Sequence, residues 1–238
     1  MQVKPEQVLS ELTNKIPPVI WVAGDETLLV QESCDQIRKF AQAQGFSERE
    51  VYTVHSGFDW NILLESSNSL SLFAEKKLID LRLNSAKLDD AGKKALHAYL
   101  ANPSEDNLLL ISSPRVEKAA TNTKWFKQIE TEAYFIVIWP INSQNLAAWI
   151  RQRLKSHGLT ADGQAIDILC QRTEGNLLAT AQEIDKLSIL ADNKELDASM
   201  VARAVADSAR FNVFTLIDTA IAGNSARALN ILYHLYSS

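Results

Sequence analysis

The chain has 238 residues, enough for one large domain or two smaller ones. Hydrophobic residues make up 46% and charged residues 22%, as in ordinary globular proteins, and no stretch approaches the roughly 18 apolar residues of a membrane span. A net charge of -5 excludes a global basic field that would hold DNA. Residues 1–13 lack the apolar run of a signal peptide, and the distant Cys34 and Cys170 indicate free thiols, so we expect a cytoplasmic protein.

Strand and helix patterns alternate through the first 140 residues. Apolar runs or alternating patterns predict strands at residues 19–23, 51–54, 78–83, 108–112 and 134–139. Helical spacing of apolar residues predicts helices at residues 27–44, 60–65, 89–100 and 117–129, whereas residues 67–73 are ambiguous. Because two of the strands are continuously apolar, we expect a parallel sheet covered by helices on both faces.

After Pro140 the pattern changes and no strand signal appears. Helices are predicted at residues 145–156, from 160 or 162 to 172, and at 177–191, 197–205, 211–222 and 226–236. Ser143 or Gln144 would cap the first of these helices, and Asn176 the third. The last two helices are too short to bury a core of their own, so we expect the chain to be truncated.

The stretch around Gly24 raises the question of nucleotide binding. A strand, a glycine and a helix in this order often form a phosphate site, because backbone N–H groups at the helix start point at the anion. In the phosphate-loop pattern G-x-x-x-x-G-K-[ST], counted from Gly24, the last three positions hold Leu29, Val30 and Gln31. Asp25 and Glu26 add negative charge where a triphosphate would lie. The order of elements suits a nucleotide site, but the chemistry is missing.

Two further parts of an ATPase are also missing. The apolar strand at 108–112 is followed by Ser113 and Pro114, so it offers no acid to hold Mg²⁺. The turn that would supply an arginine to the γ-phosphate reads Gly175-Asn176-Leu177-Leu178, with leucine in the arginine position. The four histidines are isolated and have no metal-ligand spacing. We therefore expect no catalytic residue, no metal and no cofactor, and the nucleotide site of Gly24, Val30 and Leu178 to be degenerate.

Four segments, taken in order, carry a family resemblance: VIWVAGDETLLVQESCDQI, SLSLFAEKKLIDLRL, GNLLATAQEIDKLSIL and ARFNVFTLIDTAIAGN. Together they resemble the delta subunits of bacterial DNA polymerase III clamp loaders over essentially the whole chain. The resemblance implies an α/β AAA+-like core with a parallel sheet (residues 1–140). An all-α lid (141–208) and the start of an all-α collar (209–238) would follow, and the family's collar is longer than residues 209–238.

The resemblance also implies a function and partners. A delta subunit binds the ring-shaped sliding clamp (the beta subunit) and opens one of its interfaces for loading onto primed DNA, without hydrolysing ATP itself. Its other partners are the remaining clamp-loader subunits, gamma/tau and delta-prime. No membrane partner is implied.

Clamp binding falls on Leu70, Ser71, Leu72 and Phe73 by this resemblance. In the family the matching Leu-Phe pair inserts into a hydrophobic pocket of the clamp. From spacing alone, Leu72 and Phe73 are equally compatible with ordinary core positions. We expect residues 69–73 to form the end of a short helix, or the turn after it, with the Leu-Phe pair exposed.

Basic residues gather at Arg151, Arg153 and Lys155 and could contact DNA phosphates. The alternative is a solvated helix face. Two other functions also stay open, namely a delta-prime-like clamp-loader subunit and an atypical P-loop NTPase. A delta-prime-like chain would carry a zinc-binding cysteine cluster and a Ser-Arg-Cys motif, and this sequence has neither.

Overall fold

The computed structural model describes residues 1–68, 76–173, 176–191, 194–206, 213–221 and 223–236. The chain divides into two compact units, Met1–Pro140 and Ile141–Ser238. Each unit is described by itself below. The further division of the second unit into a lid and a collar stays a prediction.

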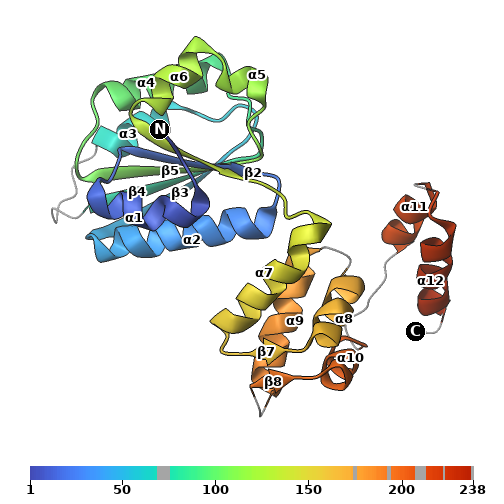
Figure 1. Cartoon of the computed structure of the whole chain (residues 1–238). Coiled ribbons are helices and arrows are strands. Elements are labelled where there is room, and N and C mark those ends of the chain that lie inside the picture. The colour runs from blue at the N-terminus through green and yellow to red at the C-terminus, as the bar shows by residue number, and fades with distance from the viewer. Residues whose placement is uncertain (69–75, 174–175, 192–193, 207–212, 222, 237–238) are drawn as a thin grey trace. The chain divides into compact units, whose positions relative to one another are not determined.

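The first unit is built on a six-stranded sheet in which every described pair of strands is parallel (Figure 1). The strand order is β1-β6-β2-β5-β4-β3. The strands are β1 (Gln2–Val3), β2 (Val19–Gly24), β3 (Phe46–Val54), β4 (Lys76–Leu83), β5 (Asn107–Ser113) and β6 (Ala133–Ile138). The prediction of a parallel sheet is therefore confirmed.

Helices cover both faces of this sheet. They are the 3₁₀ helix η1 (Pro5–Gln7), α1 (Val8–Asn14), α2 (Thr27–Ala43), α3 (Asn61–Asn68), α4 (Asp90–Ala101), α5 (Lys118–Thr121) and α6 (Lys124–Glu130). Helices α1 and α2 lie on one face, and α3, α4, α5 and α6 lie on the other (Figure 1). Each face of the sheet has its own hydrophobic core, because side chains alternate between faces along each strand.

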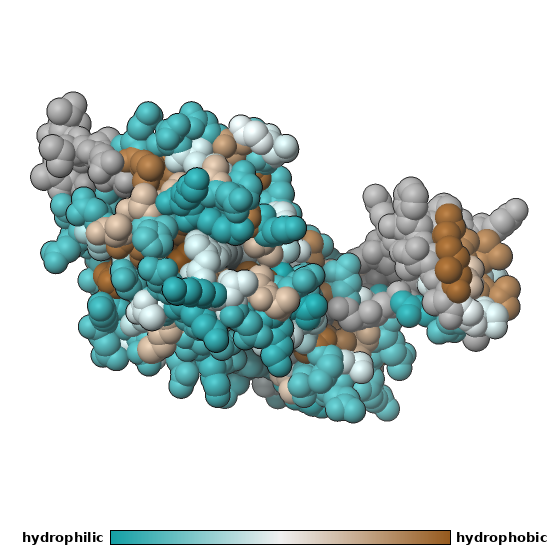
Figure 2. Space-filling model, turned by 90° about the horizontal axis from the view of Figure 1, so that it is seen from above, coloured by the Kyte–Doolittle hydropathy of each residue, from teal (hydrophilic) through white to brown (hydrophobic). Residues whose placement is uncertain are grey.

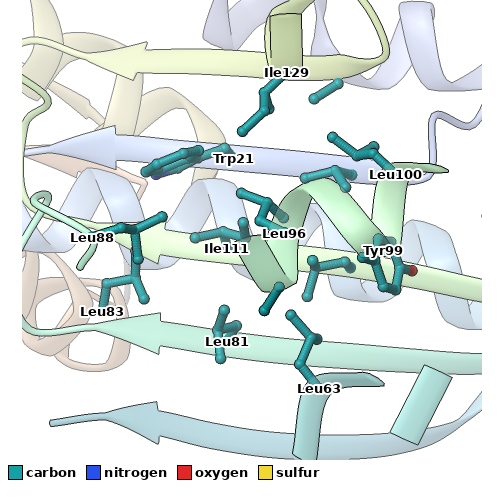
Figure 3. Packing of buried hydrophobic residues seen from close by; sticks show 14 of the residues in the cluster. Trp21, Leu63, Leu81, Leu83, Leu88, Leu96, Tyr99, Leu100, Ile111 and Ile129 are labelled. Carbon is teal, nitrogen blue, oxygen red and sulfur yellow. The ribbon is translucent and has the colours of Figure 1, made fainter. Parts of the chain in front are cut away.

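Trp21 is at the centre of the core beneath α4 and α6. Its ring lies 5.7 Å from the ring of Phe126 and 5.9 Å from that of Phe135, and the indole N–H donates to Ser113 Oγ at 2.9 Å. Leu96 of α4 and Ile111 of β5 fill the space beside it (Figure 3). All six residues of β2 are buried, which explains why its sequence is an uninterrupted apolar run.

Three parts of the first unit differ from the sequence expectations. The single helix expected at 117–129 is two short helices, because the hydroxyl of Thr123 accepts a hydrogen bond from Phe126 N and starts a new helix. Strand β3 begins at Phe46, well before the predicted residue 51. Its charged residues Glu48, Arg49 and Glu50 hid the strand, and an edge strand tolerates them. Strand β1 and helix α1 were not predicted.

The second unit is mainly helical. It contains α7 (Ser143–Ser156), β7 (Thr160–Ala161), α8 (Gly163–Thr173), α9 (Leu177–Leu190), β8 (Glu195–Leu196), α10 (Ala198–Ala206), α11 (Val213–Ile221) and α12 (Ser225–Tyr236). The two-residue strands β7 and β8 pair in parallel, so the expectation of no strand after Pro140 was wrong. Asn142 caps α7 in place of Ser143 or Gln144, and Asn176 caps α9 as predicted.

Helices α11 and α12 pack on each other. Ile231 is buried, but several large apolar side chains of the pair are exposed. They are Ile217, Ile221, Leu229, Leu232 and Tyr233. Figure 2 shows hydrophobic atoms on the surface of this right-hand part of the view.

Candidate functional site

An open cleft of about 560 Å³ lies at the carboxyl ends of the central strands, beside the start of α2. This is where ligands bind in open α/β sheets. The strand ends contribute Gly24, Leu83, Ser112 and Ser113. Residues from α2 and the adjoining loops complete the lining, namely Asp25, Thr27, Val30, Gln31, Cys34, Asp35, Arg38, Arg82 and Pro114. The cleft is the one that the sequence around Gly24 predicts.

The backbone in this cleft does not form a phosphate loop. Strand β2 ends at Gly24 and α2 already begins at Thr27, so only Asp25 and Glu26 connect them. The N–H of Val30, the residue in the lysine position, donates to Glu26 O at 3.0 Å within the helix. A phosphate loop leaves its N–H groups free to cradle an anion, whereas here the corresponding residues are wound into a helix.

Val30 and Leu178 cannot replace the charges that a nucleotide requires. The Val30 side chain is buried in the core between α2 and the sheet. Leu178 belongs to α9 of the second unit and is half exposed, beside the buried Leu177. Neither side chain has a group that bonds to a phosphate oxygen.

Gly24 is the last residue of β2 and pairs with Ile138 of β6. A Cβ atom at this position would lie 2.6 Å from both the Cβ and the carbonyl oxygen of Ile138. The glycine is therefore required by the close approach of two strands. Its interpretation from sequence as a turn glycine that ends the strand was incomplete, since Gly24 itself lies in the ladder.

The strand ends that border the cleft provide no carboxylate for Mg²⁺. Ser113 is occupied, because its Oγ accepts from the Trp21 indole and donates to Pro114 O at 2.8 Å. Asp25 does carry a carboxylate, but this group accepts from Arg115 N at 3.1 Å and lies 3.3 Å from Arg115 Nε. Among the described residues, no group of acids, histidines and cysteines is arranged to hold a metal ion.

A buried charge cluster lies along the cleft on the α2 face of the sheet. Asp80 of β4 is fully buried and accepts from Arg38 Nε at 3.1 Å and from Arg49 at 2.5 Å, and Arg82 lies 3.7 Å away. Sequence reasoning missed this cluster. The available signal was the aspartate within the apolar strand LIDLRL, since a buried acid requires cationic partners.

The predicted DNA contacts of α7 do not form one cluster. Arg151 and Lys155 are four residues apart, so they share one exposed face of the helix. Arg153 points elsewhere, with its guanidinium 5.2 Å from the centre of the Trp149 ring. Helix α7 contains no acidic residue, so Arg151 and Lys155 remain candidates for phosphate contacts.

Leu70, Ser71, Leu72 and Phe73 lie outside the described residues. The elements on either side of them are anchored. Leu63 of α3 is fully buried, and Lys77 of β4 pairs with Glu50 of β3 at 2.8 Å. The segment between α3 and β4 is thus fixed to the core at both ends.

Comparisons with known proteins address the family. Residues 21–138 match the family model "DNA polymerase III, delta subunit", and residues 142–203 match a family model described as "middle domain". The chain is 32% identical over 231 residues to DNA polymerase III subunit delta of Escherichia coli, covering 97% of this chain and 67% of the relative. The chain belongs to the DNA polymerase III delta subunit family. The Haemophilus influenzae delta subunit is also 32% identical, with 96% and 67% coverage.

A solved structure supports the same assignment at the level of fold. The Bacillus subtilis protein described as "DNA clamp loader delta protein (YqeN)" matches with a TM-score of 0.66 and 19% identity, covering 98% of this chain and 71% of that one. The predicted fold class, an AAA+-like α/β core followed by a helical region, is confirmed. None of the described helices combines the length and the apolar character that crossing a membrane requires.

Proposed function

We propose that this chain is a clamp-loader subunit that binds the sliding clamp and opens its ring for loading onto primed DNA, without hydrolysing ATP itself. The observation that carries the proposal is the cleft at Gly24. In a member of the delta family, this cleft keeps the position of a nucleotide site, while helix α2 replaces the phosphate loop and no carboxylate borders the strand ends. A subunit of this kind works in the cytoplasm by binding, and other subunits supply the hydrolysis.

The proposed partners are the sliding clamp (the beta subunit), the gamma/tau and delta-prime subunits, and primed DNA in the assembled complex. The proposed clamp contacts are Leu70, Ser71, Leu72 and Phe73, with Leu72 and Phe73 as anchors. Burying two such side chains in a pocket contributes about 1.5–3 kcal/mol each. Because the flanking α3 and β4 are held by the core, little entropy is lost outside the segment when it binds.

The two alternative functions have less support. The relatives named above are delta subunits, which argues against a delta-prime-like role. An atypical NTPase would need groups that bind phosphate and Mg²⁺, and the lining of the cleft offers Val30 and the serines in their place.

Surface plasmon resonance of this chain on its immobilised cognate clamp tests the proposal, with titration calorimetry against Mg-ATP as the second measurement. We expect clamp binding and no heat of nucleotide binding. A chain that ignores the clamp overturns the proposal. A micromolar dissociation constant for ATP overturns the non-catalytic role, because a dry site with a lysine and Mg²⁺ would be needed to reach it.

A further inference from the structure

A second hollow, distinct from the Gly24 cleft, lies on the face of the sheet that carries α5 and α6. We call it the Trp139 groove. Its volume is about 780 Å³, and its apolar floor comes from Phe126 and from the side chains of β6 and the residue after it, which face the same side: Phe135, Val137 and Trp139. Phe135 is buried, but Trp139 is 62% exposed. A large aromatic ring left this open is the feature that requires an explanation.

The rim of the Trp139 groove is basic, in contrast to the chain's net charge of -5. Arg115, Lys118 and Lys127 line it, together with the acids Glu117 and Glu130. Lys118 and Lys127 are both exposed, and neither makes an ion pair within the part of the chain that the structure describes. Two cations are thus available beside the aromatic floor.

Arg115 is not available in the same way. Its guanidinium carbon lies 5.7 Å from the centre of the Trp139 ring, and its Nε lies 3.3 Å from Asp25 Oδ2. The carboxylate of Asp25 therefore fixes the arginine, and the arginine steadies the indole through a cation–π contact. The result is a flat ring held in place, with lysines at the rim.

We infer that the Trp139 groove binds single-stranded nucleic acid, with a base stacked on Trp139 and phosphates contacted by Lys118 and Lys127. Stacking on an aromatic ring beside a basic track is how proteins bind single strands without reading sequence. The volume suits a nucleotide or two. The inference does not depend on clamp binding, because every residue of the groove lies in the first unit, apart from residues 70–73.

Other polyanions fit the groove less well. A carboxylate is recognised best by an arginine that can bond in two places, but Arg115 is already engaged by Asp25. The free cations are lysines, which act on phosphates as point charges. A duplex keeps its bases stacked on one another, so it cannot use the exposed indole.

Fluorescence anisotropy of the full chain with labelled oligothymidylate of about 15 nucleotides, over a series of salt concentrations, tests the inference. We expect Trp139→Ala to weaken binding about 5- to 150-fold and leave the salt slope unchanged, and Trp139→Phe to retain most of the affinity. Lys118→Ala with Lys127→Ala should reduce the slope of log K against log salt by about 1.4, since each phosphate contact contributes about 0.7. The control, Lys39→Ala with Lys87→Ala, removes two exposed lysines elsewhere and should change neither quantity.

Several results would overturn the inference. These are no binding by the unsubstituted chain at low salt, equal binding of a duplex of the same length, or equal competition by a polyglutamate peptide. An unchanged affinity in both Trp139→Ala and the lysine double variant would do the same. Thermal melting checks that Trp139→Ala folds, and the exposed lysine pair gives an independent answer if it does not. Clamp binding measured on the same variants should be unaffected, so a failure here is separable from a failure of the proposed function.

Discussion

Arg38 of α2 and Asp80 of β4 form a partly buried ion pair, with Nε 3.1 Å from Oδ2 and a second contact from the same guanidinium at 3.4 Å. Burial alone would lower the pKa of Arg38, but the charge and hydrogen bonds of Asp80 outweigh it and raise the pKa. The pair fastens α2 to the sheet directly beside the Gly24 cleft. The cleft wall is therefore held by protein charges, with no need for a bound nucleotide.

Replacing Asp80 by alanine should lower the free energy of unfolding by about 3 kcal/mol, because it leaves Arg38 and Arg49 without their buried partner. Urea denaturation measures the change. Asp35→Ala is the matched control, since Asp35 also pairs with Arg38, at 2.7 Å, but its carboxylate is 61% exposed. An exposed pair contributes at most about 1 kcal/mol. Equal losses in the two variants would contradict the role given to Asp80.

Gly24→Ala should destabilise the protein by about 1–3 kcal/mol, because the new Cβ would overlap with Ile138 unless β2 and β6 separate. Gly163→Ala is the control. Gly163 begins α8, and a Cβ there meets nothing within 4 Å. Thermal melting of both variants should show a clear loss for the first and little change for the second. A neutral Gly24→Ala would instead favour a turn role for this glycine.

Cys34 should make stability fall as the pH rises above about 9. Burial raises the pKa of this thiol to about 12, with smaller contributions from the neighbouring charges. Above its ordinary pKa the unfolded thiol ionises while the folded one stays protonated, so the unfolded state binds fewer protons and stability decreases with pH. Between pH 9 and 10.5 the expected loss from this group is about 2 kcal/mol.

Urea denaturation under reducing conditions at these two pH values measures the effect of the thiol. Cys34→Ala should remove most of the difference between them, whereas Cys170→Ala should keep it, because Cys170 is less buried. The same slope in the unsubstituted chain and in Cys34→Ala would contradict the assignment.

Changing Leu72 and Phe73 together to alanine should weaken clamp binding by about two orders of magnitude or more, since each 1.4 kcal/mol of lost burial is tenfold in affinity. The fold should survive if both side chains serve the clamp. Surface plasmon resonance and thermal melting are measured on the same variant. Leu178→Ala with Ile189→Ala is the control, because these residues of α9 are 50% and 84% exposed. A large fall in melting temperature would support the alternative, that Leu72 and Phe73 are core residues.

The arrangement of the first unit was predictable because its strongest signals are local. The run at β2 and the runs at β5 and β6 are apolar on both faces, which only a covered parallel sheet explains. The missing lysine at Val30 is likewise a property of the sequence alone. Where the local signal was weak, as at the charged edge strand β3, the prediction fell short.

Tertiary structure decided what depends on partners distant in sequence. Gly24 needs no side chain because Ile138, on a strand more than a hundred residues later, lies against it. Asp80 is tolerated in the core because α2 and β3 bring Arg38 and Arg49 to it. The open ring of Trp139 became a candidate site only when the fold put Lys118 and Lys127 around it. Periodicity reports which face of an element is buried, but the chain's folding in three dimensions determines which groups meet there, because contact energies depend on distance and not on sequence separation.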